Sequence, residues 1–302
     1  MQTPWGDLPV SDAHIHFFSH GFFSALAAER KAPFDELQSI LDWELPPEDP
    51  AQLADHWVAE LDRHGVSTAV LMASVPGDEA SVAAAVERHP DRLHGYFMIN
   101  PTQRSIETNL ATALASGALR GICLFPAMHH YSLHDTRLTP VFEIAASHGT
   151  VVFVHCGALS VGVRKKLALP SQFDMRHSNP LDLHAIALQF PKVNFVLPHF
   201  GAGLFRETLM LCDLCPNVHL DTSSSNKWMS YEGLDLQTVF ARALAVCGPD
   251  RLLFGTDSSF FPRGWNAAIF QKQVKALDAL NIPAASAAKI LGANLQRLLT
   301  PA

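Results

Sequence analysis

The sequence of 302 residues has little positive charge and no long apolar run. Its 22 Lys and Arg are outnumbered by 29 Asp and Glu, which gives a formal net charge of -7. Nucleic acids and anionic membranes are bound through clustered Lys and Arg, so we expect neither as a partner. No apolar run reaches membrane-spanning length, and residues 1–9 lack the basic and apolar segments of a signal peptide.

Cysteine is also scarce, and the number of cysteines is odd. An odd, scattered set in mostly apolar surroundings predicts reduced, buried thiols in a cytoplasmic protein rather than disulfides. Two of the cysteines form a single C-x-x-C in a helical context, and without a second such pair we interpret them as structural. The five positions are Cys123, Cys156, Cys212, Cys215 and Cys247.

The sequence does contain a regular alternation of strand and helix patterns. Eight short β-rich runs are separated by Ala- and Leu-rich helical patterns that mostly end at Gly or Pro, and a further helix is expected over residues 284–299. This predicts an α/β protein, a single (β/α)8 TIM barrel over residues 1–302. The expected strands are 10–16, 68–73, 93–100, 119–125, 151–155, 193–199, 217–221 and 252–257.

Two connections are too long for simple turns, and both follow strands, on the face where a barrel carries its chemistry. The insertion 17–50 is rich in aromatic residues, which either roof a pocket or form extra core beneath a surface loop. Residues 157–180 carry Arg164, Lys165, Lys166 and Arg176. These cations either bind an anionic substrate or lie on a solvated loop.

His14 and His16 form a His-x-His in the first expected strand. Side chains two residues apart in a strand point to the same face, so both imidazoles can bind one metal ion. A catalytic site usually needs three protein ligands and an open position. His155, His199 and Asp257 each close a later apolar strand. Because barrel closure brings strand ends to one rim, we expect all five side chains to meet at a metal site.

In these motifs the chain resembles the amidohydrolase superfamily, specifically the amidohydrolase-related branch that includes aminocarboxymuconate semialdehyde decarboxylase. The resemblance rests on the segments 12–16, 153–155, 197–201 and 253–258, and extends to 217–223 and 289–294. It implies that one divalent metal, zinc or alternatively manganese, is bound by His14, His16, His155 and Asp257, with His199 as a catalytic residue beside it.

The chemistry of the expected fourth strand supports one metal rather than two. A two-metal site in this superfamily commonly uses a carboxylated lysine at the end of that strand, and residues 119–126 contain no lysine. A bound divalent cation lowers the pKa of water from about 15.7 toward neutrality. Asp257 would accept the proton and His199 would polarise the electrophile.

Three functions remain open at this stage. The first is hydrolysis of a small, carboxylated ester, lactone or amide. The second is non-oxidative decarboxylation of an aromatic or unsaturated acid. The third is a metal-binding barrel without catalysis. In all three the expected partner is a small molecule, anionic for the two enzymes, and a homodimer is compatible with the sequence.

Several further residues are candidates for the pocket. Asp12 is expected on the face of His14 and His16, where it orients a metal ligand or packs at the barrel base. Asp221 is expected either to bind substrate, to fix His199 or to cap a turn. His129, His130 and His134 are expected at the surface, and His219 on the side of Asp221. The expected substrate contacts are Phe17, Arg164, Arg176, Asp221 and Arg263, and Trp265 is a weaker candidate.

Overall fold

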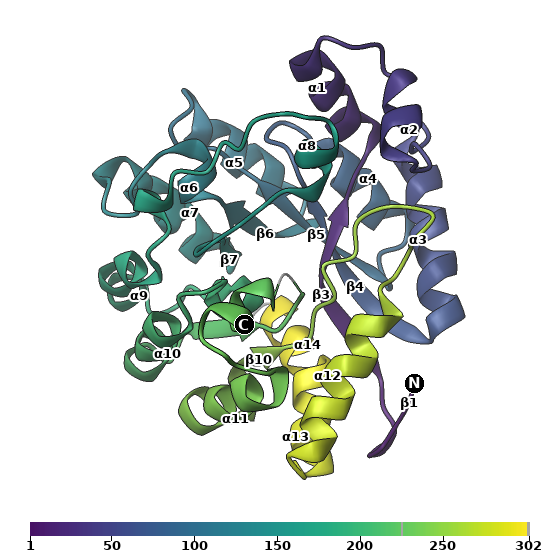
Figure 1. Ribbon diagram of the computed structural model, residues 1–302. Helices are drawn as coiled ribbons and strands as arrows, with labels where there is room; N and C mark the ends of the chain where they lie inside the picture. Colours follow the sequence, from purple (N-terminus) through teal and green to yellow (C-terminus); the bar gives the residue numbers. More distant parts are fainter. Residues whose placement is uncertain (225, 301–302) are drawn as a thin grey trace.

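The computed structural model describes residues 1–224 and 226–300, so Pro301 and Ala302 at the end of the expected domain lie outside it. Eight strands form one parallel sheet in the order β3 to β10, which confirms the predicted (β/α)8 barrel. Figure 1 shows β3 to β7 and β10 inside the surrounding helices. A short hairpin, β1 (Gln2–Thr3) and β2 (Gly6–Asp7), precedes it. The barrel strands are β3 (Val10–Phe17), β4 (Val66–Ala73), β5 (Leu93–Met98), β6 (Leu119–Leu124), β7 (Val151–Val154), β8 (Phe195–Leu197), β9 (Val218–Asp221) and β10 (Leu252–Leu253).

The barrel closes between β3 and the chain that follows β10. Ala13 N donates to Phe254 O at 2.8 Å, Asp257 N to His14 O at 3.0 Å, and His16 N to Ser258 O at 2.8 Å. β10 is shorter than predicted because residues 254–257 make separate backbone bonds to β3 and to Ile290 and no continuous ladder, and Asp257 adopts a left-handed conformation with φ 59°. The contacts that close the barrel therefore also place Asp257 beside the two histidines of β3.

Helices surround the strands on the outside (Figure 1). Several end in a left-handed glycine, as α3 does at Gly65 with φ 70°. In the described part of the chain, none of the helices has the length and apolar character that crossing a membrane requires. The main outer helices are α3 (Pro50–His64), α4 (Glu79–Arg88), α5 (Ile106–Ala115), α7 (Thr139–His148), α9 (His184–Gln189), α10 (Phe205–Leu214), α11 (Leu236–Cys247) and α12 (Ala267–Ala279).

The expected closing helix over residues 284–299 is helical throughout but not one regular α-helix. It consists of α13 (Ala284–Ala288), a π-helical turn (Lys289–Ala293) and α14 (Asn294–Leu299). Gln296 Nε2 donates to Thr68 Oγ1 at 2.7 Å, near the start of β4. The leucines of α14 pack with Val70 and Phe153 in the apolar interior of the barrel. This helix therefore covers the N-terminal end of the barrel and leaves the opposite end for the site.

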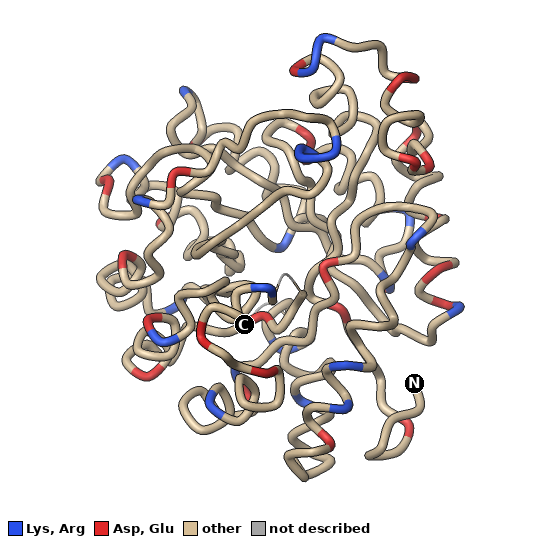
Figure 2. Tube along the Cα trace, viewed as in Figure 1, with Lys and Arg blue, Asp and Glu red and all other residues tan. Residues whose placement is uncertain are grey.

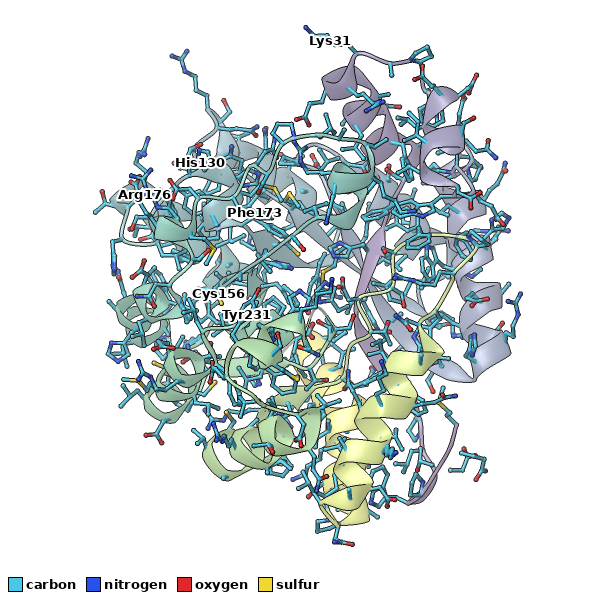
Figure 3. All side chains as sticks on the ribbon, viewed as in Figure 1. Lys31, His130, Cys156, Phe173, Arg176 and Tyr231 are labelled. Atoms are coloured by element: carbon cyan, nitrogen blue, oxygen red, sulfur yellow. The ribbon has the colours of Figure 1, made fainter. Side chains whose placement is uncertain are left out.

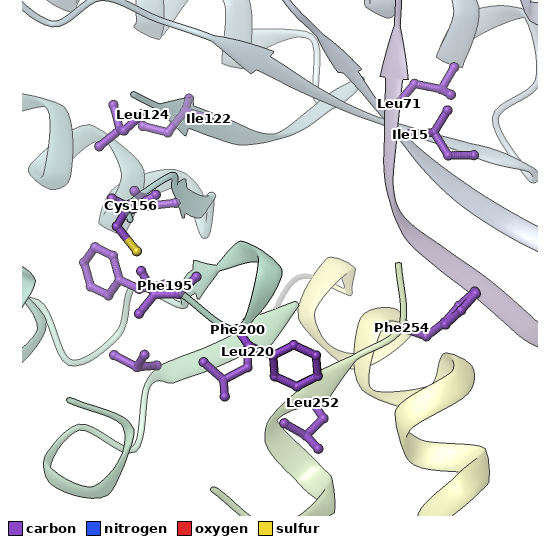
Figure 4. Packing of buried hydrophobic residues seen from close by; sticks show 14 of the residues in the cluster. Ile15, Leu71, Ile122, Leu124, Cys156, Phe195, Phe200, Leu220, Leu252 and Phe254 are labelled. Atoms are coloured by element: carbon purple, nitrogen blue, oxygen red, sulfur yellow. The ribbon is translucent and has the colours of Figure 1, made fainter. Parts of the chain in front are cut away.

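A larger apolar core lies between the strands and the outer helices. Figure 4 shows part of it, where Phe195, Leu220 and Leu252 from three neighbouring strands lie near Phe200 and Phe254. Burying such a side chain contributes about 1.5–3 kcal/mol relative to leaving it exposed. All five cysteines are buried and free of disulfides, as predicted.

The insertion 17–50, expected as a loop, contains two helices, α1 (His20–Arg30) and α2 (Glu36–Leu41). Its apolar residues pack with Val163 and Leu167, which lie in and directly after α8 (Gly162–Lys166) of the second long connection. We call residues 18–45 and 161–169 the cap. In Figure 1 the helices of the cap lie beyond one end of the strands.

Gly157 offers a test of how closely the chain packs after β7. Its φ is 75°, and a Cβ at this position would lie 2.3 Å from Gly201 O and 2.4 Å from Ala202 O. Because backbone carbonyls cannot rotate away, Gly157→Ala is expected to lower the free energy of unfolding by on the order of 2–4 kcal/mol. Urea denaturation measures the change. Gly162→Ala, where nothing lies within 4 Å, is the control; equal losses in both variants would contradict this packing.

Candidate active site

A cavity of about 750 Å3 opens at the C-terminal ends of the strands, between the barrel and the cap. His16, His155, His199 and Asp257 line it, together with six aromatic side chains. Four of the five residues expected at the metal site thus share one cavity, while His14 is fully buried and does not line it. The aromatic residues are Phe18, Phe22, Trp43, Phe125, Phe173 and Phe260.

The two histidines of β3 face each other. His14 Nδ1 lies 2.8 Å from Asp221 Oδ2, and His16 Nδ1 lies 2.8 Å from Ser74 Oγ. A carboxylate only accepts, and the Ser74 hydroxyl already donates to Met72 O, so both Nδ1 atoms carry hydrogen. Each Nε2 therefore has a free lone pair. These two Nε2 atoms are 3.3 Å apart.

Asp257 completes this group of hydrogen-bond acceptors. Its Oδ1 lies 3.2 Å from His16 Nε2 and 3.7 Å from His14 Nε2. Burial raises the pKa of Asp257, but the close contact with His16 and the nearby His14 and His199 outweigh it, and the net shift is downward. The carboxylate is therefore held in its ionised form.

His155 and His199 approach the same point from β7 and β8. Ring nitrogens of His14, His155 and His199 lie within 4.8 Å of one another. Burial lowers the pKa of His155 well below its usual value, and the neighbouring histidines lower it further. Its ring stacks on Phe125 at a centroid distance of 3.8 Å, and its buried Nδ1 has no hydrogen-bond partner among the described residues. His155 is therefore a neutral imidazole, the form that binds metals.

The backbone at His199 is under strain. His199 and Phe200 adopt left-handed φ values of 56° and 53°, which for residues other than glycine costs about 1–3 kcal/mol each. The hydroxyl of Ser223 lies 2.9 Å from His199 Nδ1. Burial lowers the pKa of His199, so this imidazole is also neutral.

The chemistry of these donor atoms fits a divalent cation. Two imidazole lone pairs and a carboxylate oxygen converge without a hydrogen between them, an arrangement that repels unless a cation lies within it. Burial lowers the pKa of His14, but the carboxylates of Asp221, Asp257 and Asp12 outweigh it and raise the pKa overall. The surroundings of His14 therefore attract positive charge. Nitrogen and carboxylate ligands in this ratio are typical of zinc, and manganese also accepts them.

Asp12 does not share a face with His14 and His16, and that prediction was wrong. The register of β3 against β4 shifts between Asp12 and Ile15, a β-bulge that places one extra residue on β3 and reverses the alternation. The Asp12 carboxylate accepts from Trp265 Nε1 at 2.7 Å, from Thr256 N at 3.1 Å and from His14 N at 2.9 Å. It fixes the backbone around the site rather than the ring of a histidine.

Two aromatic predictions were also wrong. Phe17 is fully buried in the core between strand and helices, because along β3 it alternates with His16. The next residue, Phe18, lines the cavity instead. Trp265 does not line the cavity, since its ring is buried with its nitrogen on Asp12. The alternation after His16 could have identified Phe18 from the sequence.

The three candidate arginines differ in position. Arg176 is exposed, paired with Asp174 and outside the cavity, so its prediction as a substrate contact was wrong; Figure 3 places it near the edge of the molecule. Arg164 lines the cavity, but both its terminal nitrogens bind the Glu29 carboxylate at 2.6 Å, within the cap. Arg263 lines the cavity beside Asp257, donating to Asp257 O at 3.2 Å.

The remaining polar candidates separate into two groups. Asp221 is fully buried and bonded to His14, so it fixes that histidine rather than His199 and does not contact substrate space. His219 lies on the same strand but bonds Asn194 at 3.3 Å, away from the cavity. His130 and His134 are exposed, as expected for surface positions, whereas His129 is half-buried; His129 and His130 also line the cavity. Sequence reasoning missed Ser74 and Ser223, whose contacts depend on the folded structure.

Comparisons with known proteins agree with this geometry. The family model described as Amidohydrolase matches residues 11–300. The chain belongs to the amidohydrolase family. Enzymes of this family are mostly metal-dependent hydrolases or decarboxylases. A curated protein, Protein fluG of Emericella nidulans, is 32% identical over 92 residues, 30% of this chain and only 10% of that protein's length.

Two solved structures show the same fold. The first is a 5-carboxyvanillate decarboxylase from Novosphingobium aromaticivorans with bound manganese and 3-methoxy-4-hydroxy-5-nitrobenzoic acid, with a TM-score of 0.66, 16% identity and 99% of each chain covered. The second is a probable 2-pyrone-4,6-dicarboxylic acid hydrolase from Acinetobacter baumannii with bound citric acid, with a TM-score of 0.62, 17% identity, and 97% of this chain and 99% of that one covered.

The amidohydrolase site makes a direct prediction about metal content. His155→Ala and Asp257→Asn are each expected to lower bound metal well below one ion per chain, because each removes one of the converging ligands. Elemental analysis after dialysis measures the stoichiometry. His148→Ala, on the exposed end of α7, is the matched control and is expected to retain its metal. Near-stoichiometric metal in His155→Ala would contradict its ligand role.

Proposed function

We propose that this amidohydrolase is a hydrolase with one divalent metal ion, zinc or manganese, held by His14, His16, His155 and Asp257. Its substrate is a small carboxylated ester, lactone or amide. One observation carries the proposal: an ionised carboxylate and a neutral histidine, Asp257 and His199, line the same cavity directly beside the converging histidine nitrogens.

The chain's own residues supply the proton transfers and the orientation. A divalent cation in this position supplies Lewis acidity, lowering the pKa of water and polarising a carbonyl. Asp257, held as a carboxylate, accepts the proton of the attacking water and returns it to the leaving group. His199 donates a hydrogen bond to the oxygen on which negative charge develops. The aromatic walls exclude bulk water and strengthen both interactions.

Decarboxylation is the second candidate, and the aromatic lining of the cavity favours it. Phe18 stacks on Phe22 at 4.1 Å and Trp43 on Phe260 at 3.8 Å, so flat rings form much of the wall on the cap side. A planar aromatic acid would pack well against such surfaces. In that reaction the substrate carboxylate would leave as carbon dioxide. Asp257 and His199 would deliver the proton that takes its place on the carbon atom.

Arg263 is proposed to bind the substrate carboxylate. Its guanidinium lies 4.5 Å from the Phe260 ring centroid and lines the cavity. A charge-assisted hydrogen bond is worth about 1.5–3 kcal/mol, so Arg263→Gln is expected to raise KM for a carboxylated substrate about 10- to 100-fold. Initial rates over a concentration series measure it. Arg176→Gln, outside the cavity, is the control; a KM that shifts equally in both variants would remove Arg263 from this role.

The reaction itself is tested by a panel of lactones, esters, amides and aromatic or unsaturated acids with the metal-loaded enzyme. Acid release and carbon dioxide are measured together, and acid without carbon dioxide is expected. Asp257→Asn is expected to lower kcat by about 10²- to 10⁴-fold, because it removes the proton acceptor. Carbon dioxide without hydrolysis would establish the decarboxylase instead.

A further inference from the structure

We propose that Ser223 is a positioning residue that holds His199 with its proton on Nε2, so that His199 acts as a hydrogen-bond donor and neither as a base nor as a metal ligand. The inference rests on the proposed function of this site. It goes further by assigning the protonation of the ring and the residue that sets it.

Ser223 lies two residues after the end of β9, between two of the site histidines. Its side chain is fully buried. Its Oγ is 2.9 Å from His199 Nδ1 and 3.1 Å from His14 Nδ1. Its own backbone N donates to Asp221 Oδ1, so the same carboxylate that bonds His14 also fixes the position of the serine.

The hydrogens available on His14, Ser223 and His199 determine which atom donates in each hydrogen bond. The hydrogen of His14 Nδ1 is directed to Asp221 Oδ2 at 2.8 Å, where the carboxylate oxygen accepts it. His14 Nδ1 therefore has no lone pair for the serine. Within the described residues, the remaining partner of the Ser223 hydroxyl is His199 Nδ1. A buried hydroxyl needs an acceptor, so Ser223 Oγ donates to His199 Nδ1.

The tautomer of His199 follows directly. A neutral imidazole carries one hydrogen, and an Nδ1 that accepts leaves this hydrogen on Nε2. His199 thus offers N–H to the cavity, whereas His14 and His16 offer lone pairs.

Asp221, at the end of β9, and Ser223, two residues later, therefore orient different histidines. Asp221 sets His14 so that its Nε2 can bind metal, and Ser223 sets His199 so that its Nε2 can donate to a substrate oxygen. Without the serine hydroxyl, His199 Nδ1 would lose its donor and the ring could place its hydrogen on either nitrogen. The fraction of correctly protonated rings, and with it kcat, would fall.

The first test is a nitrogen-15 NMR spectrum of the full chain loaded with zinc and labelled at histidine. The His199 signals are identified by their loss in His199→Gln. The expected spectrum shows His199 with an unprotonated Nδ1 and a protonated Nε2. A proton on Nδ1, or on both nitrogens, would overturn the proposal. The spectrum requires no turnover, so its outcome is independent of which reaction the enzyme performs.

The second test compares Ser223→Ala, Ser223→Thr and the control Ser147→Ala, which removes an exposed hydroxyl on α7. Ser223→Ala is expected to give a mixture of His199 tautomers and a kcat about 10- to 100-fold lower, with zinc content and KM unchanged. Ser223→Thr keeps the hydroxyl and is expected to restore both the spectrum and kcat. An unchanged tautomer in Ser223→Ala, or a loss of zinc that threonine does not restore, would refute the role.

Discussion

The closure of the barrel between β3 and the chain after β10 is the constraint on which the site depends. Three backbone hydrogen bonds join the two segments, and two of them involve His14 and His16 directly. The same bonds hold Asp257 within 3.2 Å of His16. The fold and the site are therefore stabilised together, since a barrel left open at this seam would lose the carboxylate of the site as well as its last strand pairing. Asp12 strengthens the seam from the outer side, bonding Thr256 and Trp265 beyond β10.

Each imidazole of the site is oriented by a different partner. His14 bonds Asp221, His16 bonds Ser74 and His199 bonds Ser223, while His155 is held by stacking on Phe125. Each hydrogen bond fixes a tautomer as well as an orientation. Identical side chains thereby acquire different roles, because the partner of one ring nitrogen decides what the other can do. Acidic and basic residues are interspersed along the chain in Figure 2, and one pair, Glu29 with the buried Arg164, joins two parts of the cap.

The sequence predicted the fold and the convergence of the five site residues because both follow from a repeating pattern and a rule of topology. Residues that end parallel strands must meet at one rim, wherever they lie in the chain. It could not predict what depends on local irregularity or on partners distant in sequence. The bulge in β3 reversed the side of Asp12, and no composition signal marks a bulge. The His14–Asp221 bond spans 207 residues and the Arg164–Glu29 pair spans 135, so neither partner was visible in advance. The helices of the insertion were missed because its aromatic residues were interpreted either as a pocket roof or as core beneath a loop, and not as helix faces.

The balance of charge explains why these parts form one unit. Asp221 is fully buried and Asp257 largely so, and burial of an ionised carboxylate is costly unless positive charge lies close by. Burial lowers the pKa values of His155 and His199, so these rings remain neutral and cannot supply that charge. Arg263 bonds the backbone carbonyl of Asp257, at the cavity side of the group, and is too exposed to neutralise Asp221. Buried carboxylates among neutral imidazoles need positive charge close by, and the proposed metal ion would supply it. The buried carboxylates would therefore favour the proposed metal ion as much as the histidines that would bind it.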